Sequence, residues 1–405
     1  MATFETDEAS NDSVQPEPKQ LIDNLIEPYI VKYYREAECY PGLSFKQGGR
    51  DMVQINVPAS HVPILLEAKP SVATKNDPYS GKNRPTIKGH AEEIRGYVVD
   101  RAKARKPWIL GTLTANVSRD KIAIIDFGKG VCLVVIPKGV SLDITDGQHR
   151  TRAIQELRQG SERTLISDDS FPITLVLEDN FRQCQTDFRD MAQTKPISKA
   201  QLVSFGDLGR DEITQKLVER VPMFQGKTQK IKPSPGSGTK FIYTSNYIAR
   251  AVSWTFANDP GNELLDRDVE ESAEVLIQCL NQFFSECSDS KYIFEKKVEE
   301  LIFEEVSAFK ENCLLGVSVG LEILGRLLYC TYDKQSNSFN EVMVSKLAKL
   351  DWSRKSRLWE NNVVRLDLDR ESKKDSASVN PYKITASTSA VATAVEVVKS
   401  QLGWK

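Results

Sequence analysis

Two apolar stretches and one helical pattern define the middle of this chain. Residues 131–136 form an unbroken run of β-branched and apolar side chains, and residues 141–145 alternate polar with apolar positions, so both predict strands. Residues 147–159 lack proline and place apolar side chains at helical spacing, which predicts a helix whose first turn Thr145 or Asp146 caps. A strand that runs directly into a helix is therefore expected here.

Helical periodicity recurs on both sides of this junction. A helix is predicted for residues 87–102, and the acid-rich segment 263–305 shows clear helical spacing of its apolar residues. The apolar run 313–329 is interrupted by polar and charged residues, so it predicts a buried helix rather than a membrane span. A further helical stripe consists of Phe181, Cys184, Phe188 and Met191.

These patterns predict an α+β protein, with a mixed α/β core domain followed by a mainly helical C-terminal domain. Residues 1–20 are rich in acidic residues, Ser, Gln and Pro, which predicts a flexible acidic tail rather than a signal peptide. The core domain is expected over residues 21–205 and the helical domain over residues 206–370. Residues 371–405 are expected to form a linker and a short terminal helix.

The formal net charge of −2 does not indicate nucleic-acid binding, yet the charge is unevenly distributed. Residues 220–258 contain no acid, and their basic residues are interleaved with aromatic residues, so phosphate contact and base stacking are both predicted for this basic loop region. The alternative is a solvated basic loop beside core aromatics. The DNA contacts predicted here are Lys227, Lys230, Lys232, Lys240 and Arg250.

Two smaller features bear on DNA binding and on metal binding. Arg354, Lys355 and Arg357 lie between Trp352 and Trp359 and form a second basic and aromatic segment, with the same two interpretations. The seven cysteines are scattered singly and the three histidines lack ligand spacing, so no metal site is expected. Single cysteines in apolar patterns fit a reducing compartment, and a cytoplasmic protein without membrane contact is expected.

The segment Asp146-Gly147-Gln148-His149-Arg150 carries the strongest chemical signal. It occupies the predicted strand-to-helix junction, where first-turn amides without intrahelical partners and the helix dipole favour an anion. Because Ala153, Ile154 and Leu157 form the apolar stripe of this helix, Arg150 starts on its inward face. An enclosed arginine needs a partner, which is either a carboxylate, Asp143 or Asp146, or a bound phosphate-type anion.

This segment matches the DGQHR motif of the DndB family, which is associated with DNA phosphorothioate (sulfur) modification, and the chain resembles that family over residues 50–365. It also resembles the nucleotide-binding Gly-Glu-Arg-Arg-x-Arg-Ala motif of ParB-like proteins, a superfamily that includes sulfiredoxin. The resemblance implies a ParB/sulfiredoxin-like core. Sulfinic-acid reduction is excluded, because Gln148 stands where sulfiredoxin has its cysteine. The implied phosphate or nucleotide ligands are Arg84, Gly147, Gln148, His149, Arg150 and Arg152.

Three functions remain open on the sequence. The favoured one is a DNA-binding transcriptional regulator whose DGQHR pocket holds ATP, CTP or a backbone phosphate. The second is a nucleotide hydrolase of a DNA-modification or phage-defence system, in which Asp146 and His149 act as acid and base with Mg²⁺. The third is an adaptor with a purely structural motif. Double-stranded DNA is the expected partner, with a nucleotide, a second copy of the chain or DNA-modification proteins as further partners.

Overall fold

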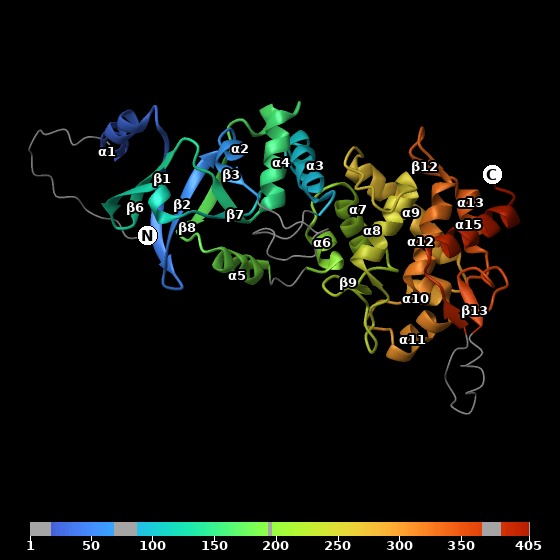
Figure 1. Cartoon of the computed structure of the whole chain (residues 1–405). Helices are drawn as coiled ribbons and strands as arrows, with labels where there is room; N and C mark the ends of the chain where they lie inside the picture. The colour runs from blue at the N-terminus through green and yellow to red at the C-terminus, as the bar shows by residue number, and fades with distance from the viewer. Residues whose placement is uncertain (1–17, 69–86, 193–196, 367–381, 405) are drawn as a thin grey trace, which may run out of the picture. The chain divides into compact units, whose positions relative to one another are not determined.

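The computed structural model describes residues 18–68, 87–192, 197–366 and 382–404 (Figure 1). The chain divides into two compact units, residues 1–195 and residues 196–405. The first is a mixed α/β unit and the second is mainly helical, which confirms the predicted fold class. The proposed tail falls mostly outside the described residues, and helix α6 (Lys199–Phe205) belongs to the second unit.

An eight-stranded mixed sheet forms the centre of the first unit, with strand order β3-β7-β4-β8-β2-β1-β6-β5. The pairs β3–β7 and β4–β8 are parallel and the other neighbouring pairs are antiparallel. Both strands predicted before the junction are confirmed, as β6 and β7. The strands are β1 (Ala37–Gln47), β2 (Arg50–Pro58), β3 (Leu66–Glu67), β4 (Leu113–Asn116), β5 (Ala123–Gly128), β6 (Val131–Pro137), β7 (Leu142–Asp146) and β8 (Ser170–Val176).

Helices cover both faces of this sheet. The helix predicted after β7 is confirmed, whereas the helix predicted from residue 87 begins only at His90, because Gly89 adopts a left-handed φ of 86°. The 3-10 turns lie at Arg119–Lys121 and Arg163–Ile166. The α-helices are α1 (Pro18–Tyr33), α2 (Val62–Leu65), α3 (His90–Lys103), α4 (Gln148–Gln159) and α5 (Phe181–Ala192).

The two faces of the sheet differ in chemistry. On one face, Ile55 of β2 and Ile173 of β8 share the apolar core with Ile154 of α4. Strand residues of the opposite parity point to the other face. On that face, α1 packs against the strands β1, β6 and β5 at one edge of the sheet. Helix α5 packs against β7, and polar side chains of the central strands beside it stay uncovered.

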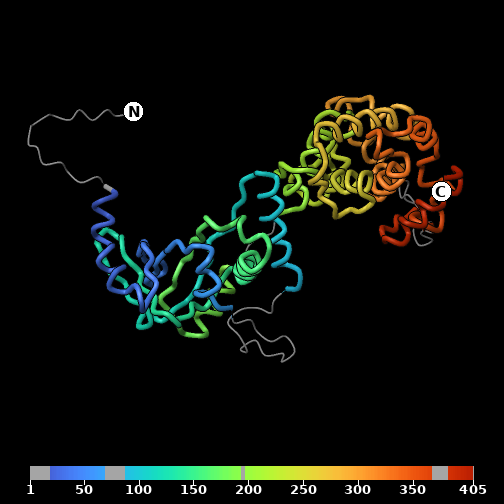
Figure 2. The backbone as a smooth tube through the Cα atoms, turned by 90° about the horizontal axis from the view of Figure 1, so that it is seen from above, coloured from blue at the N-terminus to red at the C-terminus, as the bar shows by residue number. Residues whose placement is uncertain are grey.

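The second unit is built from helices and short strand pairs, and Figure 2 shows its yellow-to-red tube as mostly helical. Its helices are α6, α7 (Gly209–Arg220), α8 (Ser245–Ala257), α9 (Val269–Glu286), α10 (Lys291–Glu295), α11 (Phe303–Asn312), α12 (Ser318–Tyr329), α13 (Glu341–Ala348) and α15 (Thr388–Leu402), with a 3-10 turn at Leu314–Gly316. Its strands pair as β9 (Thr228–Gln229) with β10 (Tyr243–Thr244), β11 (Tyr332–Asp333) with β12 (Ser338–Phe339), and β13 (Val364–Leu366) with β14 (Tyr382–Ile384).

The core of the second unit surrounds α12, which is buried as its apolar pattern predicts. Gly325 lets α12 approach α8 closely, since a Cβ atom at this position would lie 2.7 Å from the carbonyl oxygen of Ala251. Among the described helices, none combines the length and the apolar character needed to cross a membrane.

Candidate functional site

Gly147 makes the turn from β7 into α4. Its φ of 98° is left-handed, and a Cβ atom here would lie 2.5 Å from Cδ2 of Leu113, so both the backbone and the packing require glycine. The predicted side-chain cap is wrong, because the N-cap residue of α4 is Gly147 and no side chain caps the helix. Asp146 bonds instead to Arg150, and Thr145 donates to Oδ1 of the buried Asn116.

The partner of Arg150 is a carboxylate, which is one of the two kinds of partner that the sequence predicted. Its Nη2 forms an ion pair with Asp146, and its Nη1 donates to the carbonyl oxygen of Thr112 at 3.1 Å. Gly111 leaves room for this contact, since a Cβ atom there would lie 2.7 Å from Nη1. The Arg150 side chain keeps 22% of its surface exposed, so solvent reaches part of the guanidinium.

His149 is buried beneath the start of the α3 segment. Its Nε2 accepts a hydrogen bond from the backbone N–H of Ile87 at 3.0 Å, so this nitrogen carries no proton in that arrangement. The ring meets that of His90 edge to face, with centroids 4.9 Å apart, and His90 lies 3.1 Å from Glu93. Asp146 and His149, the two residues predicted to act as acid and base, are therefore each hydrogen-bonded to another group of the protein.

The other three predicted phosphate ligands, Gln148, Arg152 and Arg84, differ in their placement. Gln148 is buried beside Gly147 in the first turn of α4. Arg152 points to the exposed side of that helix, where it pairs with Glu156 at 2.8 Å and lies 3.8 Å from Glu92 of α3. These contacts raise the pKa of Arg152. Arg84 lies outside the described residues. The structure thus places Gly147, Gln148, His149 and Arg150 together at the start of α4. Arg152 lies on the other, exposed side of this helix and does not contact the partners of Arg150.

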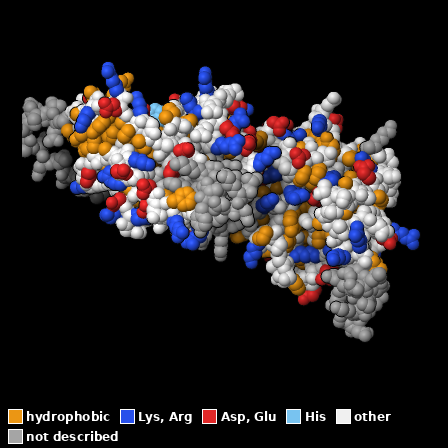
Figure 3. All heavy atoms as spheres, viewed as in Figure 1, with side chains coloured by type: hydrophobic (Ala, Val, Ile, Leu, Met, Phe, Trp, Pro, Cys, Tyr) orange, Lys and Arg blue, Asp and Glu red, His pale blue; other side chains and the backbone are white. Residues whose placement is uncertain are grey.

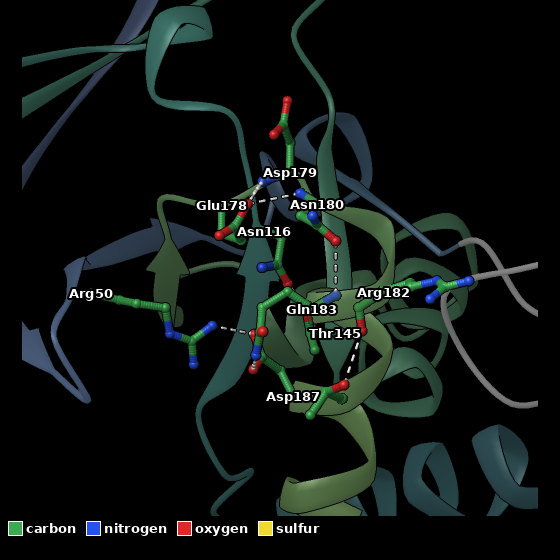
Figure 4. Close-up of polar contacts among 10 residues, drawn as sticks. Arg50, Asn116, Thr145, Glu178, Asp179, Asn180, Arg182, Gln183 and Asp187 are labelled. Carbon is green, nitrogen blue, oxygen red and sulfur yellow. Dashed lines mark hydrogen bonds and ion pairs between the residues drawn. The ribbon is translucent and has the colours of Figure 1, made fainter.

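A polar cluster under α5 is a feature that the sequence reasoning missed. Asp187 is only 7% exposed, and its carboxylate accepts from Arg50 at 2.6 Å and from Gln183 at 2.9 Å (Figure 4). The bond to Asp187 raises the pKa of Arg50. Of the apolar stripe predicted for this helix, Cys184 is buried, whereas Met191 is 37% exposed. Asp187 follows Cys184 of the predicted apolar stripe by three residues, so both lie on the same helix face. This spacing was the sequence signal for a buried carboxylate.

The start of α5 is held by its own side chains, which explains how Asp187 is positioned. Glu178 accepts the backbone N–H groups of Asp179 and Asn180, and Asn180 accepts the N–H of Gln183 (Figure 4). These bonds satisfy amides that a helix start leaves without partners. Asp187 then lies one turn further along the helix, facing the sheet.

The predicted basic loop of the second unit needs one correction. Lys227 is fully buried, and its Nζ donates to the carbonyl oxygens of Pro222 at 2.8 Å and Ile293 at 2.6 Å. Burial lowers the pKa of this amine to about 8. Lys227 is therefore a core residue, and its assignment to a DNA-binding surface is wrong. Three of the aromatic residues, Phe224, Tyr243 and Trp254, are also buried.

Lys230 and Lys232 lie on the surface of the second unit. Their side chains are exposed, while the backbone between them is fixed: Gln229 accepts the N–H groups of Ile231 and Lys232, and Ser204 of α6 donates to the carbonyl of Lys230. Residues 232–240 form an irregular, mostly exposed loop within the predicted basic loop region. Figure 3 shows Lys and Arg side chains gathered over the neighbouring α7 and α8.

The remaining predicted DNA contacts are engaged within the unit. Lys240 donates to the carbonyls of Val298 and Glu299, and Arg250 pairs with Glu322 at 3.2 Å. In the second basic and aromatic segment, Trp352 and Trp359 are fully buried with their ring centroids 5.1 Å apart. The core interpretation therefore holds for both tryptophans.

A family model described as "DndB: DNA-sulfur modification-associated" matches residues 40–405, which is nearly the whole chain. The chain belongs to the DndB family. The match runs from β1 to the C-terminus, so it includes the DGQHR junction, the α5 cluster and the exposed lysines. No curated protein and no solved structure matches the chain significantly. Within the described part of the chain, no group of three or more His, Cys, Asp or Glu residues is arranged to hold a metal ion.

Proposed function

We propose that this protein is a DNA-binding regulator associated with DNA sulfur modification, and that its DGQHR junction binds a phosphate group. Membership of the DndB family supports the association with sulfur modification. The observation that supports DNA binding most directly is the exposed pair Lys230 and Lys232 on a backbone fixed by hydrogen bonds. A fixed backbone reduces the ordering cost of each phosphate contact, and lysine is a suitable point charge for it.

Arg150 supports the phosphate site. In the structure, Asp146 supplies the negative charge that Arg150 needs, at the uncapped start of a twelve-residue helix. A phosphate has the same charge sign and the same ability to accept two hydrogen bonds from one guanidinium. We therefore propose that phosphate displaces Asp146 from Arg150. The ATP or CTP expected from the resemblance would bring its phosphates to this position.

The DNA contact is tested by replacing Lys230 and Lys232 together with alanine. Each replacement removes one cation, so we expect weaker duplex binding and a salt slope smaller by roughly one unit per lysine, as counterion release requires. Fluorescence anisotropy at stepped salt concentrations measures both quantities. The matched control is Lys346→Ala with Lys349→Ala, two exposed lysines of the second unit on and just after α13. Equal losses of duplex affinity in the two double variants would contradict the proposed DNA contact.

The exchange at Arg150 predicts opposite effects of two substitutions. Arg150→Ala should weaken ATP or CTP binding about tenfold or more, since a hydrogen bond to a charged group contributes roughly 1.5–3 kcal/mol. Asp146→Asn should strengthen binding, because it removes the charge that competes with phosphate. Calorimetric titration measures both, with Arg158→Ala at the far end of α4 as the control. If nucleotide binds equally to all three variants, the phosphate does not lie at Arg150.

The same titrations test the hydrolase alternative. Phosphate release with Mg²⁺ that disappears in Asp146→Asn and His149→Ala would support a hydrolase. Nucleotide binding without release would support a regulator gated by ligand. We favour the regulator because Asp146 and His149 each hold a contact that acid–base catalysis would have to break.

A further inference from the structure

A polar hollow lies on the α5 side of the central sheet. Its volume is about 420 Å³, within the range of small-molecule sites. Strands β2, β4 and β8, which neighbour one another inside the sheet, form its floor, and α5 forms a wall. Its lining includes Arg50, Met52, Gln54, Thr112, Thr114, Thr174, Val176, Asp187 and Met191.

The floor is polar where a covered sheet is usually apolar. Thr114 and Thr174 are directly paired across β4 and β8, and Gln54 is paired with Thr174 across β2 and β8. Cross-strand partners share a face, so two hydroxyls and one amide form a continuous row. The neighbouring residues of opposite parity, such as Ile55 and Ile173, are fully buried in the apolar core. The polar row is therefore confined to the face that the hollow exposes.

The charged groups that line the hollow are already paired with opposite charges. Arg50 is paired with Asp187 at 2.6 Å, and Asp190 with Arg189 at 2.8 Å. A free phosphate or a cation would find no uncompensated opposite charge among these pairs. The hydroxyl and amide groups favour an uncharged ligand that both donates and accepts hydrogen bonds. Met52, Val176 and Met191 add apolar surface, and thioethers make favourable contacts with flat rings.

Thr112 and Thr114 of the hollow are neighbours of the DGQHR junction. Thr112 lines the hollow, and its carbonyl oxygen accepts the hydrogen bond from Nη1 of Arg150. Asp146, the other partner of Arg150, pairs across the strands with Thr114 of the hollow floor. A ligand with an uncharged polar ring at one end and a phosphate at the other would satisfy both regions.

We infer that the hollow under α5 binds the nucleoside part of a nucleotide. Its base lies against the methionines and Val176, its polar edges meet Thr114, Thr174 and Gln54, and its phosphate points towards Arg150. The inference rests on the proposed function, because Arg150 is the proposed phosphate site. The nucleoside comes from a free nucleotide or from an unpaired nucleotide of DNA, since both present the same chemistry.

The test uses the full chain and two variants of the hollow. Thr114→Val with Thr174→Val removes both hydroxyls at nearly constant volume, and Met191→Ser alters the exposed wall, where folding depends little on the side chain. Thr164→Val with Thr388→Val, at two exposed threonines, is the matched control. Two arms are measured: titration with AMP and CMP, and anisotropy with a duplex that contains one unpaired nucleotide, compared with the fully paired duplex.

We expect both hollow variants to weaken binding by at least about fivefold in one arm, as the loss of single hydrogen bonds or ring contacts predicts. Weakening with AMP or CMP identifies a free nucleotide as the source, and weakening only with the unpaired nucleotide identifies DNA. If neither arm distinguishes the hollow variants from the control, or wild type binds neither probe, the inference is overturned. Salt-dependent binding of the paired duplex would then still stand, so the proposed function is judged separately.

Discussion

Replacing Gly147 with alanine is expected to lower the free energy of unfolding by about 2–5 kcal/mol, because left-handed strain contributes roughly 1–2 kcal/mol and overpacking roughly 1–3 kcal/mol. The residue has a φ of 98°, and the new Cβ atom would lie 2.5 Å from Leu113 in the core of the sheet. Urea unfolding followed by circular dichroism measures the loss. The first unit is the part of the chain in which this loss should appear.

Gly139→Ala separates the two contributions. Gly139 also has a left-handed φ, of 89°, but no atom lies within 4 Å of the Cβ position. This control should cost only the conformational strain, about 1–2 kcal/mol. If Gly147→Ala costs no more than Gly139→Ala, the close packing of the DGQHR junction against Leu113 is not what makes glycine necessary.

Lys227→Ala is expected to destabilise the second unit by about 2–4 kcal/mol, the usual cost of a core cavity combined with buried groups left without a partner. The alanine would leave the carbonyl groups of Pro222 and Ile293 without the ammonium donor that they now share. Lys230→Ala, three residues away and exposed, should change the stability by less than about 0.5 kcal/mol. Thermal unfolding compares the two variants. Equal stabilities would contradict the core role of Lys227.

The same residue predicts a pH dependence. Burial lowers the pKa of Lys227 from 10.5 to about 8 in the folded protein, so between these values the unfolded chain binds more protons than the folded one. Stability contributed by this group therefore rises as the pH increases from about 8 towards 10.5. Wild type should gain stability relative to Lys227→Met over this window. A difference that stays constant with pH would contradict the lowered pKa.

The regular elements around the motif were predictable because their signals are local. An apolar run and an alternating segment determine β6 and β7, and helical spacing determines α4. The cap was not predictable in the same way, because Thr145 bonds to Asn116, which is 29 positions away in the sequence. The sequence named both classes of partner for Arg150, but only the fold shows that Asp146 takes this place.

The exposed and buried lysines could not be separated from the sequence. Lys227 and Lys230 lie three residues apart in an acid-free segment, and nothing local marks the first as a core residue. The pairing of Arg50 with Asp187 joins positions 137 residues apart, so it depends on the order of β2, β8 and α5 in space. Local sequence predicts which elements form, and the tertiary fold decides which polar side chains meet.

The salt dependence of duplex binding tests the central claim most directly. Wild-type protein is titrated with labelled double-stranded DNA between about 50 and 200 mM salt, a range over which phosphate contacts lose affinity steeply. The proposed function predicts measurable binding at the lower concentration and a linear fall of log affinity with log salt. Absence of binding at the lower concentration, or binding that does not change with salt, would contradict a DNA-binding regulator.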